Sequence, residues 1–226
     1  MELKDVVPWG RTMAEYKSMF SLNDTSLSGA VLGCGDGPAS FNAQATRTGC
    51  NVTSIDPIYA FDKAAIAKRI SNVRLEVMDQ IRKNQADYIW KTIESPEQLE
   101  KIRLVAMEDF LSDFESGLED GRYIPGGAPD LPFEDNEFDL ALCSHFLFLY
   151  TNQLGYEKHL QCVQSLVRVA TEVRIFPLSS VHNNEVSAHL KPIISELNKA
   201  KFTTEIVTVD YEFMRGATQM LVISNE

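Results

Sequence analysis

Short apolar runs alternate with amphipathic segments along most of this chain. Residues 30–32 and 51–55 predict two strands, and residues 38–48 between them predict a helix that ends at Gly49. A strand, a helix and a second strand in this order are typical of a βαβ unit, whose two strands are parallel. The first part of the chain therefore predicts an α/β fold.

The later segments continue the same alternation. Helical spacing of apolar residues or helix-start signals occur at residues 11–22, 62–69, 76–91, 156–170 and 185–200, and at Ser95-Pro96. Strand-like runs occur at residues 103–106, 138–144, 172–176, 203–209 and 220–224. The last two runs are close enough to pair as an antiparallel hairpin. We expect one domain over residues 1–226, with a helical insert at about 61–100 and an acidic insert at about 108–130.

Charge is concentrated in one segment. The chain has 21 basic and 32 acidic residues, a net charge of −11. This charge disfavours nucleic acid as a partner, because affinity for nucleic acid depends on Lys and Arg neutralising phosphates. Eleven acidic residues and one basic residue, Arg122, lie between Glu108 and Asp139. Two interpretations of this segment remain open: a solvated loop, or a lid that steers a cationic ligand.

Other features bound the class of protein. The four cysteines (Cys34, Cys50, Cys143 and Cys162) have no CxxC spacing, so we expect reduced thiols and no metal site. Residues 1–10 lack the apolar core of a signal peptide, and the most apolar stretch, residues 140–150, is too short to span a bilayer. We expect a cytoplasmic protein whose partner is a small molecule and not a membrane; the oligomeric state stays open.

The most informative segment is the glycine-rich loop after the first strand, Gly33-Cys34-Gly35-Asp36-Gly37. Glycine permits a tight turn and lets a ligand approach the backbone closely, and the following helix directs N–H groups toward that ligand. A dinucleotide fingerprint has its third glycine at the sixth position, which is Pro38 here. No Gly-Lys-Ser/Thr follows, so the loop is not a P-loop.

Residues 31–37 resemble motif I of the class I (Rossmann-like) S-adenosylmethionine-dependent methyltransferases. Asp56, 19 residues after Gly37, matches the acid that binds the ribose hydroxyls in that family, and residues 131–140 resemble the stretch leading into its fourth strand. The resemblance covers residues 28–224. It implies a mostly parallel seven-stranded sheet with an antiparallel last strand, helices on both faces, a lid helix at about 10–22, S-adenosyl-L-methionine as cofactor and methyl transfer as activity.

The resemblance also implies a cofactor site built from the loops after four strands. Its residues are Gly33, Cys34, Gly35, Asp36 and Gly37 in the glycine loop, Asp56 and Pro57 after the second strand, Met107, Glu108 and Asp109 after the third, and Ser144 after the fourth. In this arrangement Met107 packs on the adenine ring, and one of the two neighbouring carboxylates accepts a hydrogen bond from its amine.

One position departs from the family pattern. The acid that usually stands two places before the first glycine, and helps to hold the methionine amino group, is Val31 here. Either another group performs this task, with Asp36 the nearest, or the cofactor binds more weakly. Arg11, in the expected lid segment, would then meet the cofactor carboxylate.

His145 follows Ser144 at the end of the predicted fourth strand, where open α/β sheets bind their ligands. Two roles fit it: a general base that takes a proton from an acceptor O–H or N–H, or a buried structural histidine. The strand ends in Cys143-Ser144-His145-Phe146 and lacks the Asn-Pro-Pro-Tyr type of tetrapeptide of the amine-modifying nucleic-acid enzymes in the family.

Three functions from different classes remain open. The first is methyl transfer to an unidentified acceptor, most simply a small molecule. The second is a non-catalytic module with a methyltransferase-like fold, which Val31 and the two inserts keep open. The third is a nicotinamide-dependent oxidoreductase, which Pro38 and the expected antiparallel end strand disfavour.

Overall fold

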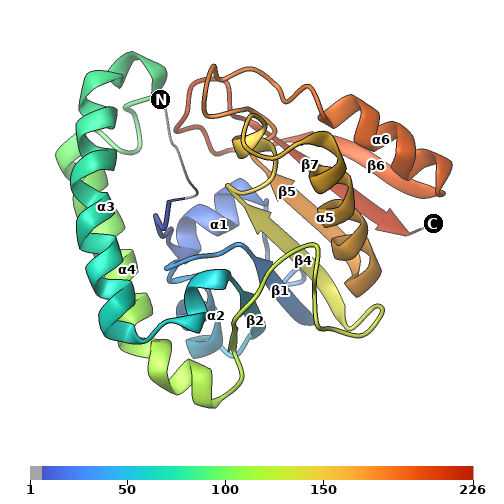
Figure 1. Ribbon diagram of the computed structural model, residues 1–226, viewed down its shortest axis with the longest axis horizontal. Coiled ribbons are helices and arrows are strands. Elements are labelled where there is room, and N and C mark those ends of the chain that lie inside the picture. The colour runs from blue at the N-terminus through green and yellow to red at the C-terminus, as the bar shows by residue number, and fades with distance from the viewer. Residues whose placement is uncertain (1–6, 226) are drawn as a thin grey trace.

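A computed structural model describes residues 7–225. Residues 1–6, on which part of the signal-peptide argument depends, lie outside the described residues. A seven-stranded sheet of order β3-β2-β1-β4-β5-β7-β6 lies at the centre of the fold (Figure 1). The strands are β1 (Ala30–Cys34), β2 (Asn51–Ile55), β3 (Tyr123–Ile124), β4 (Phe138–Ser144), β5 (Ala170–Phe176), β6 (Phe202–Thr208) and β7 (Gln219–Asn225).

The direction of the strands agrees with the sequence prediction. Strands β1 to β5 pair in parallel, with Cys34 at the end of β1 opposite Cys143 in β4. Strand β7 is antiparallel to both β5 and β6, so the predicted terminal hairpin is confirmed. The carboxyl ends of β1, β2 and β4 therefore meet at one edge of the sheet.

Helices cover both faces of the sheet. They are α1 (Met13–Met19), α2 (Phe41–Arg47), α3 (Lys63–Lys83), α4 (Pro96–Glu119), α5 (Tyr156–Val169) and α6 (Leu190–Lys199), with short 3-10 turns η1 (Pro57–Ala60), η2 (Gln85–Asp87) and η3 (Phe148–Tyr150). One core joins Leu32 to Leu166 of α5, and the other joins Val31 to Phe41 of α2. Strand β4 is buried on both faces except at Asp139, as expected for a strand covered by two helical layers.

The prediction of a strand at residues 103–106 is wrong. These residues lie in the middle of α4, which begins at the predicted Ser95 cap with Pro96 at its first position. Leu99, Ala106 and Phe110 are fully buried at helical spacing, so the local apolar run is one face of a long helix. The third strand lies later in the chain, at Tyr123–Ile124.

The prediction of two helices at residues 62–69 and 76–91 is also wrong. A single helix, α3, begins at its cap Asp62 and ends at Lys83. Its buried residues continue through Val73 and Val77 without a break, because α3 packs along α4 (Figure 1). The two helices run antiparallel to each other at one side of the sheet (Figure 1).

The predicted acidic insert at 108–130 is not one loop, because residues up to Glu119 belong to α4. Several of its acids pair with basic side chains: Asp109 with Arg47, Glu115 with Lys63, and Asp113 with Arg122. These pairs offset part of the local negative charge. Among residues 7–225, no helix is long and apolar enough to cross a membrane.

Candidate functional site

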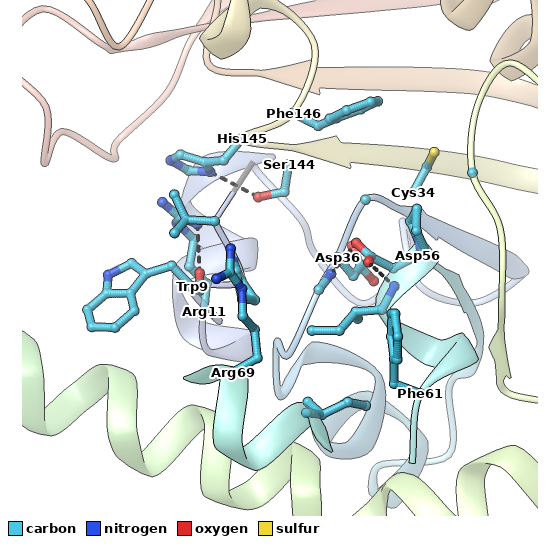
Figure 2. Close-up of a pocket in the computed structure, with 18 of the residues that line it drawn as sticks. Trp9, Arg11, Cys34, Asp36, Asp56, Phe61, Arg69, Ser144, His145 and Phe146 are labelled. Carbon is cyan, nitrogen blue, oxygen red and sulfur yellow. Dashed lines mark hydrogen bonds between the residues drawn. The ribbon is translucent and has the colours of Figure 1, made fainter. Parts of the chain in front are cut away.

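A cavity of about 530 Å³ lies at the carboxyl ends of β1, β2 and β4 (Figure 2). Its size is within the range of pockets that bind small molecules and cofactors. Its lining comes from segments far apart in the sequence: Val7, Pro8, Trp9, Arg11, Tyr16, Cys34, Gly35, Asp36, Gly37, Asp56, Pro57, Ile58, Phe61, Ala65, Ile66, Arg69, Gly127, Ala128, Ser144, His145 and Phe146.

The glycine loop forms the floor of this cavity. Gly35 and Gly37 have φ values of +73° and +53°, in the left-handed region that glycine adopts without strain. A Cβ atom on Gly37 would approach no atom closer than 3.9 Å, so this glycine faces open space. A Cβ atom on Gly33 would overlap the Asp36 carboxylate, so Gly33 is required by packing within the loop.

Asp56 links the end of β2 to the glycine loop. Its Oδ2 accepts a hydrogen bond from the Gly37 N–H at 2.9 Å, and its Oδ1 accepts one from the Ile58 N–H, also at 2.9 Å. Burial raises the pKa of Asp56 despite these two bonds. Asp56 thus caps η1, and it also lines the cavity with lone pairs available to a ligand.

Asp36 is the second carboxylate of the cavity. Its Oδ1 accepts a hydrogen bond from the Tyr16 hydroxyl and its Oδ2 accepts one from the Ser54 hydroxyl, both at 2.7 Å. Burial, which outweighs these two bonds and is assisted by the charge of Asp56, raises the pKa of Asp36 to about 6. Val31, where the family usually has an acid, is fully buried in the core and does not line the cavity.

Ser144 and His145 stand at the end of β4 on the opposite side of the cavity (Figure 2). His145 has a φ of +52°, donates its N–H to the Phe176 carbonyl, and its Nδ1 lies 3.0 Å from Ser144 Oγ. Burial, followed by the positive charges of Arg11 and Arg103, holds the pKa of His145 well below its usual range. The imidazole is therefore neutral near pH 7.

The segment before α1 brings Trp9 and Arg11 to the cavity. It lies directly on the glycine loop, because a Cβ atom on Gly10 would overlap the Pro38 carbonyl, and the Ser40 N–H donates to the Arg11 carbonyl. The Arg11 side chain lines the cavity and donates to the Trp9 carbonyl at 3.1 Å. Burial lowers the pKa of Arg11, and the charge of Arg103 adds to this effect.

Four predicted site residues do not line the cavity: Gly33, which packs against Asp36 within the glycine loop, and Met107, Glu108 and Asp109. Met107 is buried in an aromatic cluster with Phe110, Glu108 is exposed, and Asp109 forms an ion pair with Arg47. Met107, Glu108 and Asp109 lie on α4. They were assigned to the adenine because a strand was expected at residues 103–106, and that strand does not exist. The other predicted cofactor residues that line the cavity are Cys34, Gly35, Asp36, Gly37, Asp56, Pro57 and Ser144.

The structure adds several residues that sequence reasoning missed. Gly127 and Ala128 follow the short strand β3, and the preceding Pro125-Gly126 turn was the signal that could have placed a strand end there. Ile58 and Phe61 follow Asp56 and give the cavity an apolar wall. Trp9 carries no sequence signal, because its place depends on how the N-terminal segment packs.

The arrangement suits a ligand with a polar ribose-like part and an apolar ring. Two carboxylates and the backbone of a glycine loop lie on one side, and apolar side chains lie beside them. Among the described residues, no group of three or more His, Cys, Asp or Glu side chains could hold a metal ion.

Comparisons with known proteins place the fold. No family model matches the chain. The uncharacterized protein MJ0045 of Methanocaldococcus jannaschii is 32% identical over 225 residues, which cover 99% of this chain and 98% of that protein. The structure of the mitomycin 7-O-methyltransferase MmcR aligns with a TM-score of 0.51 at 11% identity, over 95% of this chain and 54% of that one. Magnesium protoporphyrin IX methyltransferase of Synechocystis PCC 6803, crystallised with bound SAM, aligns with a TM-score of 0.48 at 12% identity, over 90% and 73% of the two chains.

At this identity the likeness to MmcR concerns the fold. Together with the strand order and the antiparallel β7, it confirms the predicted Rossmann-like methyltransferase fold.

Proposed function

We propose that this chain, which belongs to the same family as the uncharacterized protein MJ0045 of Methanocaldococcus jannaschii, transfers the methyl group of S-adenosyl-L-methionine to a small molecule. The observation that carries this proposal is the contact of Asp56 with the Gly37 N–H in the cavity. This contact joins the acid after β2 to the glycine loop within a methyltransferase fold. Asp56 can therefore bind a ribose at the place where the glycine loop lets a ligand come close to the backbone.

The lining residues fit the ribose, the adenine and the methionine ammonium of this cofactor. Asp56 would accept hydrogen bonds from the ribose hydroxyls, and Ile58 with the Gly127-Ala128 loop, in place of Met107, would hold the adenine. The methionine ammonium pairs with Asp36, which takes the role that Val31 cannot perform. These assignments rest on the places of the side chains along one continuous cavity.

When bound, S-adenosylmethionine supplies an electrophilic methyl group on a sulfonium. Its S–CH₃ bond would break as the acceptor bonds to the methyl carbon, with the electron pair left on the sulfur. The protein holds the two partners in line, which is most of its task. The neutral His145 is placed to take the acceptor proton through Nε2, in the tautomer whose Nδ1–H donates to Ser144 Oγ.

Two observations favour this function over a nicotinamide-dependent activity. The sixth position of the glycine loop is Pro38, and the Pro38 carbonyl is covered by Gly10, so this part of the loop is packed against protein. The antiparallel β7 differs from the parallel strand order of the dinucleotide-binding fold.

The experiment is calorimetric titration of the protein with S-adenosylmethionine, S-adenosylhomocysteine and NAD. We expect the two adenosyl ligands to bind at micromolar concentration and NAD to bind far more weakly. In Asp56→Ala, the loss of hydrogen bonds to a charged group should weaken both adenosyl ligands by about tenfold to a hundredfold.

The control is Asp79→Ala, which removes an exposed carboxylate from α3 and should leave the affinities unchanged. A thermal melt of each variant separates lost binding from lost folding, since Asp56 also caps η1. No binding of either adenosyl ligand would overturn the proposal. Binding without methyl transfer to any class of acceptor would favour the non-catalytic module.

A further inference from the structure

A second, smaller chamber of about 80 Å³ adjoins the main cavity. The two share the side chains of Val7, Trp9, Arg11 and His145, so His145 stands at their junction. Apart from Arg103, the rest of the chamber lining is aliphatic or aromatic, and its aromatic members are Tyr88, Tyr150, Phe176, Tyr211 and Phe213. These aromatic residues come from the end of η2, from η3, from β5 and from the segment after β6, which only the tertiary fold brings together.

Two guanidinium groups enter this apolar chamber, from Arg11 and Arg103, and none of the described residues that line it is an Asp or a Glu. Arg103 is 1% exposed, although it lies on α4 about 90 residues after Arg11. A buried charge is costly without a partner. The nearest carboxylate is Glu15, which accepts a hydrogen bond from Arg103.

Glu15 has little capacity left for a second cation. Besides Arg103, its carboxylate accepts hydrogen bonds from the Thr12 N–H at 3.0 Å, from the Thr12 hydroxyl and from the Tyr211 hydroxyl at 3.0 Å. One carboxylate therefore faces two guanidinium groups. The Arg11 side chain donates only to a neutral carbonyl, that of Trp9, among the contacts of the described chain.

Both arginines also keep an unused donor. Arg11 Nε and Arg103 Nε are buried and have no hydrogen-bond partner among residues 7–225. Buried donors are almost always paired in folded proteins, so two orphaned donors beside one chamber indicate a missing acceptor. The main cavity holds two further acids, Asp36 and Asp56, but neither lines the chamber. Each already accepts two hydrogen bonds from other parts of the protein.

We propose that this chamber binds the methyl acceptor, and that the acceptor is a compact molecule with an apolar body and one carboxylate. The inference rests on the proposed function, because the main cavity is assigned to the cofactor. Arg103 lines the chamber and not the main cavity, so it is assigned to the acceptor carboxylate, while Arg11 stands between the two ligands.

Size and charge both restrict the acceptor. A single carboxylate balances the one excess positive charge, whereas a phosphate dianion would exceed it. Guanidinium groups suit the planar, paired oxygens of a carboxylate. A water requires about 10–15 Å³ on this scale, so the chamber has room for about five to eight groups of that size, or one ring with a carboxylate.

The test compares benzoate with benzamide, which have the same shape but differ in charge. Each is titrated calorimetrically into the protein, alone and saturated with S-adenosylhomocysteine. We expect benzoate to bind about tenfold or more tightly than benzamide, because it alone pairs with the buried cations. In Arg103→Met this preference should disappear, and affinity for S-adenosylhomocysteine should stay within about twofold of wild type.

Arg47→Met is the control, because it removes an exposed arginine that pairs with Asp109 far from the chamber lining. Arg103→Met leaves Glu15 without its partner and can unfold the protein. The double variant Arg103→Met/Glu15→Gln removes both charges, a replacement that proteins often tolerate, and should show the same loss of preference.

Benzamide binding as tightly as benzoate to the wild-type protein, or neither ligand binding, overturns the inference. A folded double variant that still prefers benzoate overturns it as well. Failure of the proposed function gives a different result, because S-adenosylhomocysteine then does not bind to the protein. The preference for benzoate over benzamide can still be measured in that case, since one titration contains no S-adenosylhomocysteine.

Discussion

The two carboxylates at the glycine loop differ in what holds them. Asp56 accepts two backbone N–H bonds, which tie it to the loop and to η1. Asp36 accepts two hydroxyl bonds from Tyr16 and Ser54, residues that the sequence pattern gave no reason to place beside it. The loop was predictable from spacing, but the environment that sets the charge of Asp36 was not.

Binding of S-adenosylhomocysteine should depend on pH through Asp36. Because burial raises the pKa of Asp36 to about 6, a proton competes with the ligand ammonium below that value. Affinity should therefore rise as pH increases through 6 and level off above it. Calorimetry between about pH 5 and pH 8 measures this.

In Asp36→Asn, binding near pH 8 should be about tenfold weaker and its dependence on pH should flatten. His145 is not expected to titrate near pH 7, because burial and the charges of Arg11 and Arg103 hold its pKa well below its usual range. A dependence of the same size in the Asn variant would assign the titration to another group and remove Asp36 from the ammonium site.

At the scale of elements, α4 supports the glycine loop from a distance. Phe110 of α4 is fully buried against Tyr59, with ring centroids 5.8 Å apart, and the Tyr59 hydroxyl donates to the Gly37 carbonyl at 2.7 Å. Residues 103–106, wrongly predicted as a strand, belong to this helix, which lies behind the cofactor cavity and contributes no residue to its lining.

Phe110→Ala should lower the free energy of unfolding by about 3–5 kcal/mol, because it leaves a cavity among Tyr59, Phe114 and Tyr123. Denaturant unfolding measures the loss. Val105→Ala is the matched control on the same helix, since Val105 is 54% exposed and should change stability by less than about 0.5 kcal/mol. Equal effects of the two substitutions would show that the cluster does not carry stability.

At the scale of the whole molecule, one buried group joins three distant segments. Glu15 of α1 accepts hydrogen bonds from Arg103 of α4 and from Tyr211, which follows β6. Burial alone would raise the pKa of Glu15, but the charge and hydrogen bond of Arg103 outweigh it and hold this pKa at about 2. The ion pair therefore links α1, α4 and the segment after β6, and it fixes Arg103 in the wall of the acceptor chamber.

Glu15→Gln should destabilise the protein by about 3–5 kcal/mol near neutral pH, because Arg103 is left buried without a counter-charge. The pKa of Glu15 in the folded protein is lower than the usual 4.5 of a free glutamate, so the wild-type advantage is complete above pH 4.5 and is lost as pH falls through 2. Denaturant midpoints of the two proteins across this range test both statements.

Glu97→Gln is the control, because its ion pair with Arg82 is exposed and screened by solvent, so its removal should change stability far less. If Glu15→Gln loses no more stability than this control, the ion pair between Glu15 and Arg103 does not stabilise the fold, and the prediction is wrong.

The sequence by itself determined the strand–glycine loop–helix–strand unit, the acid at Asp56, the strand β4 and the terminal hairpin. Each of these depends on local spacing: glycines at alternate positions, a short apolar run, or a two-residue or 3.6-residue period. Local spacing also explains the errors, since a short apolar run such as residues 103–106 has the same pattern in a strand and in one turn of a buried helix.

Only the tertiary structure decided what surrounds the site. The two-residue strand β3 is too short for periodicity to reveal, and Gly127 and Ala128 reach the cavity because of it. Arg103 is a charged residue within a helix, which a sequence pattern assigns to solvent, yet packing of α4 against α1 and the segment after β6 buries it. Burial and charge pairing depend on contacts between residues far apart in the chain, and these determine which ligand the chamber accepts.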